Sequence, residues 1–479
     1  MSLDIAVIAA YLLGMVAVGW WGVRRSGTRS DYLVAGRRLG GFMYAGTMSA
    51  VVLGGASTVG GVGLGYREGL SGAWLVLTIG LGILLLSAAL ARPIARLRVY
   101  TVAEVLDLRY GGGSTALPGA VMAAYTLMLT VTNTLAFSTL FNALFDLPRA
   151  VGIVLGGGVV VLYSTLGGMW SVTITDIVQF GIKTVGVFAL LLPIALVRAG
   201  GFAGIEQRLG PEVLDLGRAG PGTVVTYLLT YMLGLLIGQD IWQRVSTARN
   251  QRVARTAGIA SGLYCVLYAL AGALIGTAAH ALHPGLADPD DAFAAIARDV
   301  LPAGVRGLVL AAALAAVMST ASGGLIACST VATHDLWGRF RRTGEDVGTN
   351  RLFTLAVGVV AIAIAVAVDD VVAALTAAYN ILVGGLLVPI VGGLVWRRGT
   401  RAGALTAMLA GAVAVVVTMA ALGTMAEEAI YAGLGASLLG YVLASLATAP
   451  TEEAVLHRWR ERLAGREPGE SAQPGRQPA

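Results

Sequence analysis

The sequence predicts an all-α protein that crosses a membrane many times. Hydrophobic residues make up 56% of its 479 residues and charged residues only 13%, whereas a soluble domain has about 25% charged residues. The mean hydropathy of +0.78 agrees with this composition. Apolar runs of about 20 residues, the length that crosses a hydrocarbon core, follow one another along the chain. A soluble globular protein is therefore excluded.

Thirteen such runs, each bounded by charged or turn residues, are predicted as transmembrane helices. Together they leave no stretch long enough for a folded soluble domain, so residues 1–448 form one transmembrane domain. Residues 449–479 are expected to form a cytoplasmic tail that is disordered beyond about Gly465. The connecting segments 101–110 and 289–300 are predicted as short interfacial helices. The thirteen spans are 2–23, 40–66, 70–91, 115–141, 148–168, 176–197, 223–243, 254–282, 302–336, 351–368, 371–396, 402–423 and 427–448.

The positions of the arginines predict the orientation, because Arg and Lys resist translocation and stay cytoplasmic. They gather in alternate loops, whereas the complementary loops are acidic. This pattern predicts a multi-pass protein of the plasma membrane, with the N-terminus outside, the C-terminus cytoplasmic and the first segment retained as a span. The net charge of +6 is then a topology signal rather than a sign of a nucleic-acid partner. Lys183 lies within a span, and we expect its side chain to reach the cytoplasmic interface. The arginine-rich segments are 24–38, 92–109, 244–255, 339–351, 397–401 and the tail.

One predicted span, within 40–66, is unusually rich in glycine. Residues 49–65 read SAVVLGGASTVGGVGLG. Small residues allow close helix packing in membranes, which is one explanation. The other is a discontinuous helix, whose freed backbone groups form a binding site at the bilayer midplane. Gly54 and Gly55 are followed at once by Ser57 and Thr58, residue types that cap a new helix start. We therefore expect a break here, with exposed carbonyls at residues 50–53.

A second polar cluster lies in the apolar segment 314–330, LAAVMSTASGGLIACST. Ser319 and Thr320 follow Ala316 by three and four positions, so both hydroxyls lie over its carbonyl on one helix face. Each hydroxyl could simply bond to its own preceding turn. Alternatively, these oxygens and the carbonyls of the broken helix form a neutral cage, which suits a hard cation such as Na⁺.

With these residues the chain resembles the sodium:solute symporter family, which includes proline, pantothenate, sialic acid and sodium/glucose transporters. The resemblance implies a leucine-transporter fold with two five-helix inverted repeats, 40–197 and 223–396. It also implies one extra helix before them, 2–23, and two after them, 402–448. The implied function is sodium-coupled symport of a small organic solute by alternating access. The matching stretches are DYLVAGRRLGGF (31–42), SAVVLGGASTVGGVGLGYREG (49–69), YSTLGGMWSVTITDIVQF (163–180), GQDIWQRVSTARNQRVAR (238–255) and AAVMSTASGGLIACSTVATHDLW (315–337).

The resemblance also implies which residues bind Na⁺. The ligands would be the carbonyls of Ala50, Leu53 and Ala316 and the hydroxyls of Ser319 and Thr320. A second sodium site of some members corresponds here to Asp176 and Ser322, but Gly323 stands where that site has another serine. Asp176 and Ser322 could therefore line an exit path instead, and Asp176 could simply be hydrated at the cytoplasmic end.

The solute pocket is expected beside the break. Each candidate could instead make an interhelical hydrogen bond without touching a solute. Val52 stands where proline transporters carry an aspartate, and Ala56 and Val76 stand where sugar transporters carry polar groups. The residues at Ala56 and Val76 disfavour a sugar, whereas helix amide ends that can hold an anion favour a small carboxylate, an amino acid or a vitamin-like solute. The candidate residues are Ser57, Thr58, Asn133, Tyr231, Leu235, Gln239, Tyr379 and Asn380.

Two alternatives to sodium symport remain. One is a transporter of the same fold that is driven by protons or runs uncoupled. The other is a membrane enzyme, but the His280–His283 pair lacks the glutamate of an HExxH protease and no GxSxG motif occurs. We therefore expect no enzymatic activity, and we expect a small organic solute, Na⁺ and the lipid bilayer as the partners.

Overall fold

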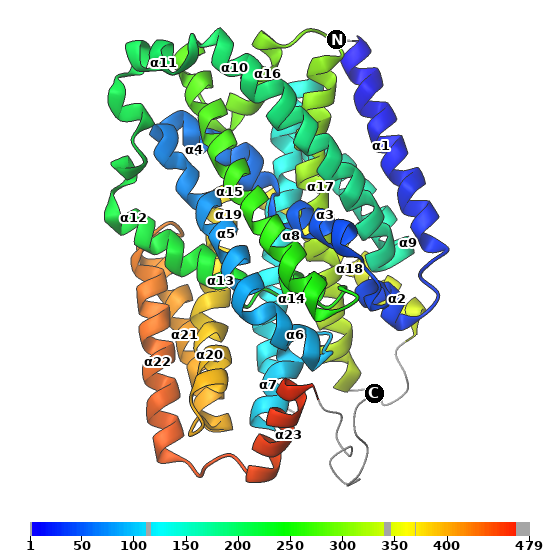
Figure 1. Ribbon diagram of the computed structural model, residues 1–479, viewed down its shortest axis with the longest axis vertical. Coiled ribbons are helices and arrows are strands. Elements are labelled where there is room, and N and C mark those ends of the chain that lie inside the picture. Colours follow the sequence, from blue (N-terminus) through cyan, green and yellow to red (C-terminus); the bar gives the residue numbers. More distant parts are fainter. Residues whose placement is uncertain (1, 112–115, 340–345, 369, 466–479) are drawn as a thin grey trace.

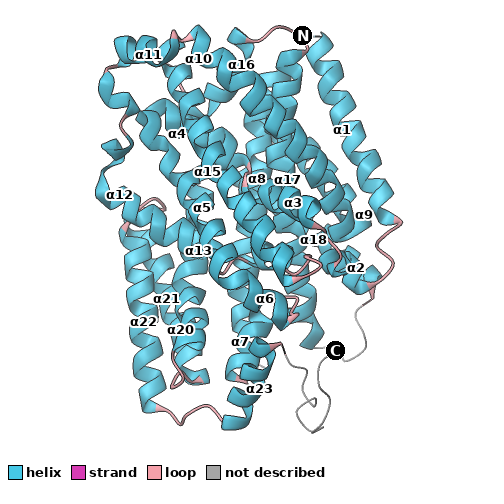
Figure 2. Cartoon of the chain, in the orientation of Figure 1, coloured by secondary structure: helices cyan, strands magenta, loops and turns pink. Residues whose placement is uncertain are grey.

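The computed structural model describes residues 2–111, 116–339, 346–368 and 370–465, and these residues fold into helices joined by short loops (Figure 2). The α-helices are α1 (Ser2–Val23), α2 (Arg29–Val34), α3 (Gly41–Val52), α4 (Gly61–Glu68), α5 (Trp74–Leu85), α6 (Ala91–Leu97), α7 (Val102–Tyr110), α8 (Ala116–Phe145), α9 (Arg149–Thr184), α10 (Leu192–Arg198), α11 (Gly201–Leu209), α12 (Gly220–Tyr227), α13 (Leu233–Leu235), α14 (Gln239–Val245), α15 (Gln251–Leu282), α16 (Ala292–Val300), α17 (Val305–Val331), α18 (Val347–Ala367), α19 (Val371–Leu382), α20 (Val388–Val395), α21 (Arg401–Leu422), α22 (Glu428–Ala447) and α23 (Glu453–Ala464).

Short 3₁₀ or π segments continue or connect these helices. They are η1 (Ala35–Arg37), η2 (Ala56–Gly60), η3 (Gly69–Ala73), η4 (Leu86–Leu90), η5 (Val185–Leu191), η6 (Pro211–Leu214), η7 (Leu216–Ala219), η8 (Leu228–Met232), η9 (Pro289–Asp291), η10 (Ala332–Leu336), η11 (Trp337–Arg339) and η12 (Val383–Leu387).

Ten helices among the described residues are long and apolar enough to cross a membrane, and one bent pair adds an eleventh. Two of the ten are much longer than one crossing requires, since about 20 residues suffice. These two are Ala56–Leu97, with 42 residues, and Arg149–Arg198, with 50. In each of these two segments, the chain reverses its direction at a glycine.

The turn in α9 lies at Gly168, whose φ of 55° and ψ of −144° interrupt the helix. The Tyr163 hydroxyl donates to the Met318 carbonyl (3.2 Å) and Lys183 Nζ lies 3.5 Å from the adjacent Ser319 Oγ, although a straight helix would separate Tyr163 and Lys183 by about 30 Å. The chain therefore reverses at Gly168. A Cβ atom at this position would also lie 2.6 Å from the Tyr32 ring and carbonyl oxygen, so only glycine fits.

A second reversal lies at Gly69, which has a φ of 65°. It brings Gly72 of η3 against the Leu64 backbone of α4. The described helices correspond to the thirteen predicted spans when the chain is divided at the two reversals. For this match, α3 and the helix that follows it count as one span. Helices occur at both connecting segments predicted to hold them, as α7 and, after the short turn η9, as α16.

The arginine-rich loops before α3, between α6 and α7 and after α14 lie together, and we call this part of the molecule the arginine-rich end. Arg37 donates to the carbonyls of Arg98 (2.9 Å) and Val99 (3.2 Å). Leu39 forms an isolated bridge with the segment after α14, through the bonds Leu39 N to Thr247 O and Arg249 N to Leu39 O, both 3.0 Å. The beginning of α1 and the helix α23 lie at opposite ends of the molecule (Figure 1).

The tail forms one more helix than the sequence predicts. α23 packs against α6 and α7, and its Val455 and Trp459 are buried. These two residues lie four positions apart and so face the same side of the helix. The predicted disorder beyond about Gly465 lies outside the described residues.

Helix α17 lies at the centre of the bundle, between α8 and α9 (Figure 1). Residues 309–331 of this helix are all buried. Because its sequence is rich in Ala, Gly and Ser, neighbouring backbones can approach it closely. The outer helices α1, α21 and α22 instead present large exposed apolar side chains, as lipid-facing helices do. The polar residues of α17 are therefore held in the middle of the protein.

Candidate functional site

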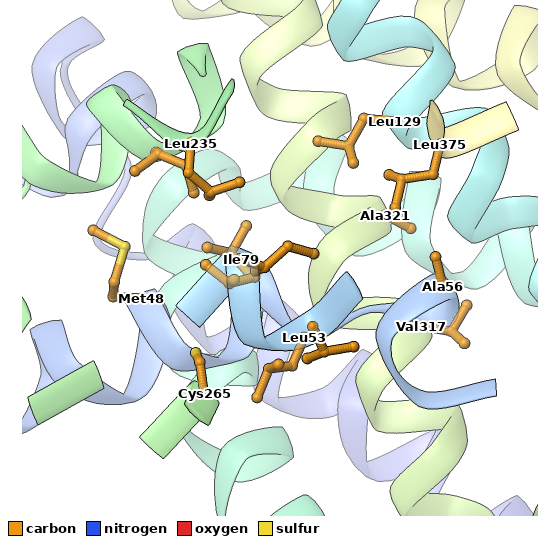
Figure 3. Packing of buried hydrophobic residues seen from close by; sticks show 14 of the residues in the cluster. Met48, Leu53, Ala56, Ile79, Leu129, Leu235, Cys265, Val317, Ala321 and Leu375 are labelled. Atoms are coloured by element: carbon orange, nitrogen blue, oxygen red, sulfur yellow. The ribbon is translucent and has the colours of Figure 1, made fainter. Parts of the chain in front are cut away.

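The glycine-rich span is broken where the sequence predicts a break. Helix α3 ends at Val52, Leu53 adopts non-helical angles (φ −99°, ψ 77°), and helical structure resumes at η2. A Cβ atom on Gly54 would lie 2.2 Å from Asn133 Oδ1 and 2.5 Å from Thr320 Oγ1. Only glycine therefore allows this close approach of α8 and α17 to the break. Figure 3 shows Ala56, just after the break, beside Val317 of α17.

The carbonyls freed at the end of α3 all have side-chain partners, as buried backbone groups require. Thr320 donates to the carbonyl of Val51 (2.7 Å), and Ser57 donates to that of Val52 (3.3 Å). Ser319 lies 2.8 Å from the carbonyl of Ala50 and 2.9 Å from that of Ala316. The two polar clusters found in the sequence thus meet, and the oxygens of the expected sodium ligands gather between α3 and α17.

Lys183 of α9 lies among these oxygens, and the expectation that it reaches the cytoplasmic interface is wrong. Its side chain is completely buried. Its Nζ lies 3.1 Å from the carbonyl oxygen of Ala50, 3.2 Å from that of Leu53 and 3.5 Å from Ser319 Oγ. The freed carbonyls of the broken helix are close enough for the ammonium to bind without leaving the protein interior. The sequence shows a lysine in a span but not which helix lies opposite it.

Asn133 of α8 completes the break on its other side. The backbone N–H of Gly55 donates to Asn133 Oδ1 (2.7 Å), and Asn133 Nδ2 donates to the Leu129 carbonyl (2.8 Å). The amide therefore satisfies a backbone donor that the break releases. Asn133 therefore stabilises the conformation of the break, and it also lines the neighbouring cavity.

Asp176 is buried and paired, so the alternative of a hydrated carboxylate is wrong. It accepts hydrogen bonds from Thr47 and from Arg244 (3.1 Å), and the side chains of both ion-pair partners are at most 1% exposed. Ser322 donates to the carbonyl of Ser319 (3.0 Å). A Cβ atom on Gly323 would lie 2.3 Å from Val51 Cγ2 and 3.3 Å from Arg244 Nη2. The guanidinium thus occupies the space beside the residues expected to form a second sodium site.

A small cavity with both apolar and polar walls lies next to the break. Four of the eight predicted solute residues line it, and the walls also include two polar residues not predicted for the solute. The four are Ser57, Asn133, Leu235 and Tyr379, and the two are Asp240 and Thr320. Figure 3 labels three of the apolar lining residues, Leu129, Leu235 and Leu375.

The other four predicted solute residues do not line the cavity. They form interhelical hydrogen bonds instead, which is the alternative interpretation given for each candidate in the sequence. Gln239 joins α14 to the segment before α7, because it donates to the Tyr100 carbonyl (2.8 Å) and accepts from the Val102 N–H (2.9 Å). The others pair with neighbouring hydroxyl groups: Thr58 with Tyr268 (2.9 Å), Tyr231 with Thr376 (2.7 Å) and Asn380 with Thr230 (3.1 Å).

Asp240 is a site residue that the sequence analysis missed. It is buried and accepts a hydrogen bond from the Tyr125 hydroxyl (2.9 Å), and the ring of Tyr125 packs on Tyr379 at 5.4 Å. It lies in the second half of another broken helix, in which the helices before and after residues 236–238 meet at 46°. A carboxylate within an apolar span is by default a candidate functional residue, and that signal was present in the sequence.

Comparisons with known proteins agree with this architecture. The sodium:solute symporter family matches residues 32–411. The osmoregulated proline transporter OpuE of Bacillus subtilis (strain 168) is 28% identical over 445 residues, which cover 87% of this chain and 89% of OpuE. A sodium/proline symporter of Staphylococcus aureus (strain JH9) is 28% identical over 469 residues, with 92% of this chain and 91% of the symporter covered.

Two solved structures show the same fold. A Na⁺-coupled sialic acid symporter in a substrate-bound outward-open state superposes with a TM-score of 0.81 at 18% identity, covering 94% of this chain and 98% of the symporter. Mhp1, a nucleobase-cation-symport-1 family transporter, superposes with a TM-score of 0.60 at 17% identity, covering 91% of this chain and 98% of Mhp1. The predicted all-α, leucine-transporter-like fold is confirmed.

The matched family and these relatives are transporters, so the membrane enzyme is excluded. The family match covers well over half of the chain. The chain belongs to the sodium:solute symporter family.

Proposed function

We propose that this chain carries a small organic solute across the membrane by cation-coupled symport with alternating access. The observation that carries the proposal is the break after α3, next to a small cavity between α8, α14 and α17 into which Asn133, Asp240 and Thr320 bring polar groups. Backbone groups freed within a membrane persist only where they line a cavity or meet protein partners. We further propose that 40–197 and 223–396 are the two inverted repeats, whose relative rocking opens the cavity to each side in turn.

The solute is proposed to be an amino acid. Asp240 supplies a carboxylate that can bind an amine, and no Arg, Lys or His is among the residues that line the described cavity. A solute that carried only a carboxylate would face Asp240 with like charge. The proline named for two relatives supports the same solute class.

The proposal is tested by uptake into proteoliposomes that contain the full chain. Radiolabelled L-proline is the first probe, followed by the other amino acids and by small carboxylates, with inward Na⁺ and H⁺ gradients applied together. Accumulation above that of empty liposomes is expected for at least one amino acid. Accumulation of none of these solutes would refute the proposed function.

Asp240→Asn is expected to reduce the apparent affinity for the amino acid at least 30-fold, while the protein still folds. Truncating one partner of a buried charge pair costs about 2 kcal/mol or more, which corresponds to that factor. Uptake kinetics measure the change, and Glu206→Gln, an exposed carboxylate in α11, is the matched control. An unchanged KM for Asp240→Asn would show that the amine does not bind there.

We also propose that the N-terminus lies outside and that the arginine-rich end faces the cytoplasm. The two native cysteines, Cys265 and Cys328, are buried, so they give little background in a labelling experiment. A membrane-impermeant maleimide applied to intact cells should label the variant Glu206→Cys but not Glu453→Cys. The reverse pattern would invert the topology.

Na⁺ is supported as the coupling ion by the family and by the sodium-coupled relatives. One observation favours a second candidate for this chain, which is coupling to a cation other than Na⁺. Lys183 already binds three of the oxygen atoms expected to bind Na⁺.

A further inference from the structure

A second cavity, of about 490 Å³, lies at the arginine-rich end of the molecule. It lies between the segment that leads into α3, helix α6, the segment between α14 and α15, and the end of α23, and it shares no lining residue with the cavity next to the break. Its volume falls within the range of small-molecule sites, about 300–1,000 Å³. We call it the arginine cavity, because the described charged residues that line it are all arginines: Arg37, Arg96, Arg98, Arg249 and Arg462.

Four of these arginines have no acidic partner among the described residues. Two other arginines do have one, since Arg38 pairs with Asp31, and Arg460 pairs with Glu453 at 3.0 Å. The positive charges of the four are therefore not neutralised by ion pairs within the part of the chain that the structure describes. The four are Arg37, Arg96, Arg249 and Arg462.

Like charges around one cavity repel one another. Partial burial lowers the pKa of Arg37 from its ordinary value, and the charge of Arg98 acts in the same direction. The tendency of arginine to stay on one side of a membrane explains why arginines gather at one end of the molecule. It does not explain why five of them, from four separate segments, converge on one cavity. A bound anion would remove the repulsion.

The walls of the arginine cavity are held together by hydrogen bonds. Arg96 of α6 donates to Gln251 Oε1 (3.1 Å) in the first turn of α15 and to the Leu463 carbonyl (3.4 Å) of α23. Gly465, which ends α23, lies against Arg96, because a Cβ atom there would lie 3.6 Å from its Cδ. Asn250, which caps α15, and Gln251 also line the cavity. The N-terminus of a helix attracts anions, so it adds to the positive potential of the arginines.

We propose that the arginine cavity binds an anion that carries phosphate groups. A planar guanidinium can donate two parallel hydrogen bonds to one phosphate. The apolar helix Ala56–Leu97 ends at this cavity, so its arginines lie where a membrane-spanning helix meets the lipid headgroups. Basic pockets between membrane helices bind anionic headgroups. Phospholipid headgroups and soluble phosphate compounds share this chemistry, and the experiments below separate them. The site goes beyond the proposed symport, and its tests do not depend on transport.

Thermal unfolding of the purified full chain in detergent tests the inference. Potassium pyrophosphate is the soluble probe, and short-chain phosphatidylglycerol is the headgroup probe. At least one of them should raise the melting temperature saturably, by about 2 °C or more. Potassium citrate at equal ionic strength and short-chain phosphatidylcholine, which has no net charge, should not. The inference would be overturned if neither phosphate probe stabilised the protein, or if citrate stabilised it as much as pyrophosphate.

A pair of double variants tests where the probe binds. Arg249→Gln with Arg462→Gln removes two charges from the arginine cavity, and neither side chain makes a hydrogen bond with the described residues. This variant should melt at the wild-type temperature without the probe. Its apparent affinity for the probe should fall at least about tenfold, the factor that one hydrogen bond to a charged group contributes.

Arg92→Gln with Arg252→Gln is the matched control. It removes the same charge from two exposed arginines of the same end that do not line the cavity. The control should bind the probe as the wild type does. Equal affinities of the two double variants would show that the probe does not bind in the arginine cavity.

Native mass spectrometry separates the two sources of phosphate in a bilayer. The full chain is released from nanodiscs that contain equal amounts of phosphatidylglycerol and phosphatidylcholine. If the ligand is a lipid headgroup, the wild type and the control variant should each retain at least one more phosphatidylglycerol molecule than the cavity variant. Equal retention by all three proteins would exclude the lipid and assign the site to a soluble phosphate compound, and without stabilisation by pyrophosphate it would overturn the inference.

Discussion

Arg244→Met is expected to destabilise the protein by about 3–5 kcal/mol, the usual cost of leaving one member of a buried ion pair without its partner. Asp176 and Arg244 are at most 1% exposed, and they join α9 to α14. One oxygen of Asp176 already has no hydrogen-bond partner among the described residues, so the loss of Arg244 leaves the carboxylate with Thr47 alone. Thermal unfolding in detergent, followed by fluorescence, measures the effect.

Arg249→Met is the matched control for Arg244→Met. Arg249 lies five residues later and is exposed, so its replacement should change the melting temperature little. The double variant Asp176→Asn with Arg244→Met should recover part of the lost stability, because it leaves no uncompensated charge. A wild-type melting temperature for Arg244→Met alone would show that the pair contributes nothing to the folded state.

Gly54→Ala is expected to abolish transport and to lower the stability by about 1–3 kcal/mol, the range typical of an overpacked core. The new methyl group would collide with Asn133 Oδ1 and Thr320 Oγ1 at 2.2 and 2.5 Å. Relief of this collision would move α8 or α17 and with it the hydroxyl groups that bind the end of α3. Uptake and thermal unfolding measured on the same preparation test both parts.

Gly158→Ala in α9 serves as the control, because no atom lies within 4 Å of a Cβ atom built there. Replacing a glycine in a helix interior by alanine favours the helix by up to about 1 kcal/mol. The control should therefore keep its transport activity and its stability. If Gly54→Ala behaved like Gly158→Ala, the break would not depend on the missing side chain.

Features that depend on neighbours along the chain could be predicted from the sequence. The apolar runs place the spans, because a membrane helix must be apolar over its whole length. The pair Gly54–Gly55 with the hydroxyls that follow it indicates the break, since both signals are local. The same reasoning identifies Ser319 and Thr320, which lie on one helix face by their spacing.

Contacts between distant helices could not be predicted in this way. Lys183 was expected at the interface because that is usually the nearest polar region for a lysine in a span. Here the freed carbonyls of another helix lie closer, and only the packing of α9 against α3 reveals them. Likewise, Thr58, Tyr231 and Asn380 find hydroxyl partners on neighbouring helices, which the sequence of one helix does not reveal.

The isolated bridge at Leu39 has a mechanical consequence. Its two backbone hydrogen bonds tie the segment that leads into α3 to the segment that leaves α14. These helices belong to the two broken spans that carry the cation site and Asp240. At the arginine-rich end, the two spans must therefore either move together as one rigid body or first break these two backbone hydrogen bonds. Each bond would contribute about 1 kcal/mol toward the joint motion.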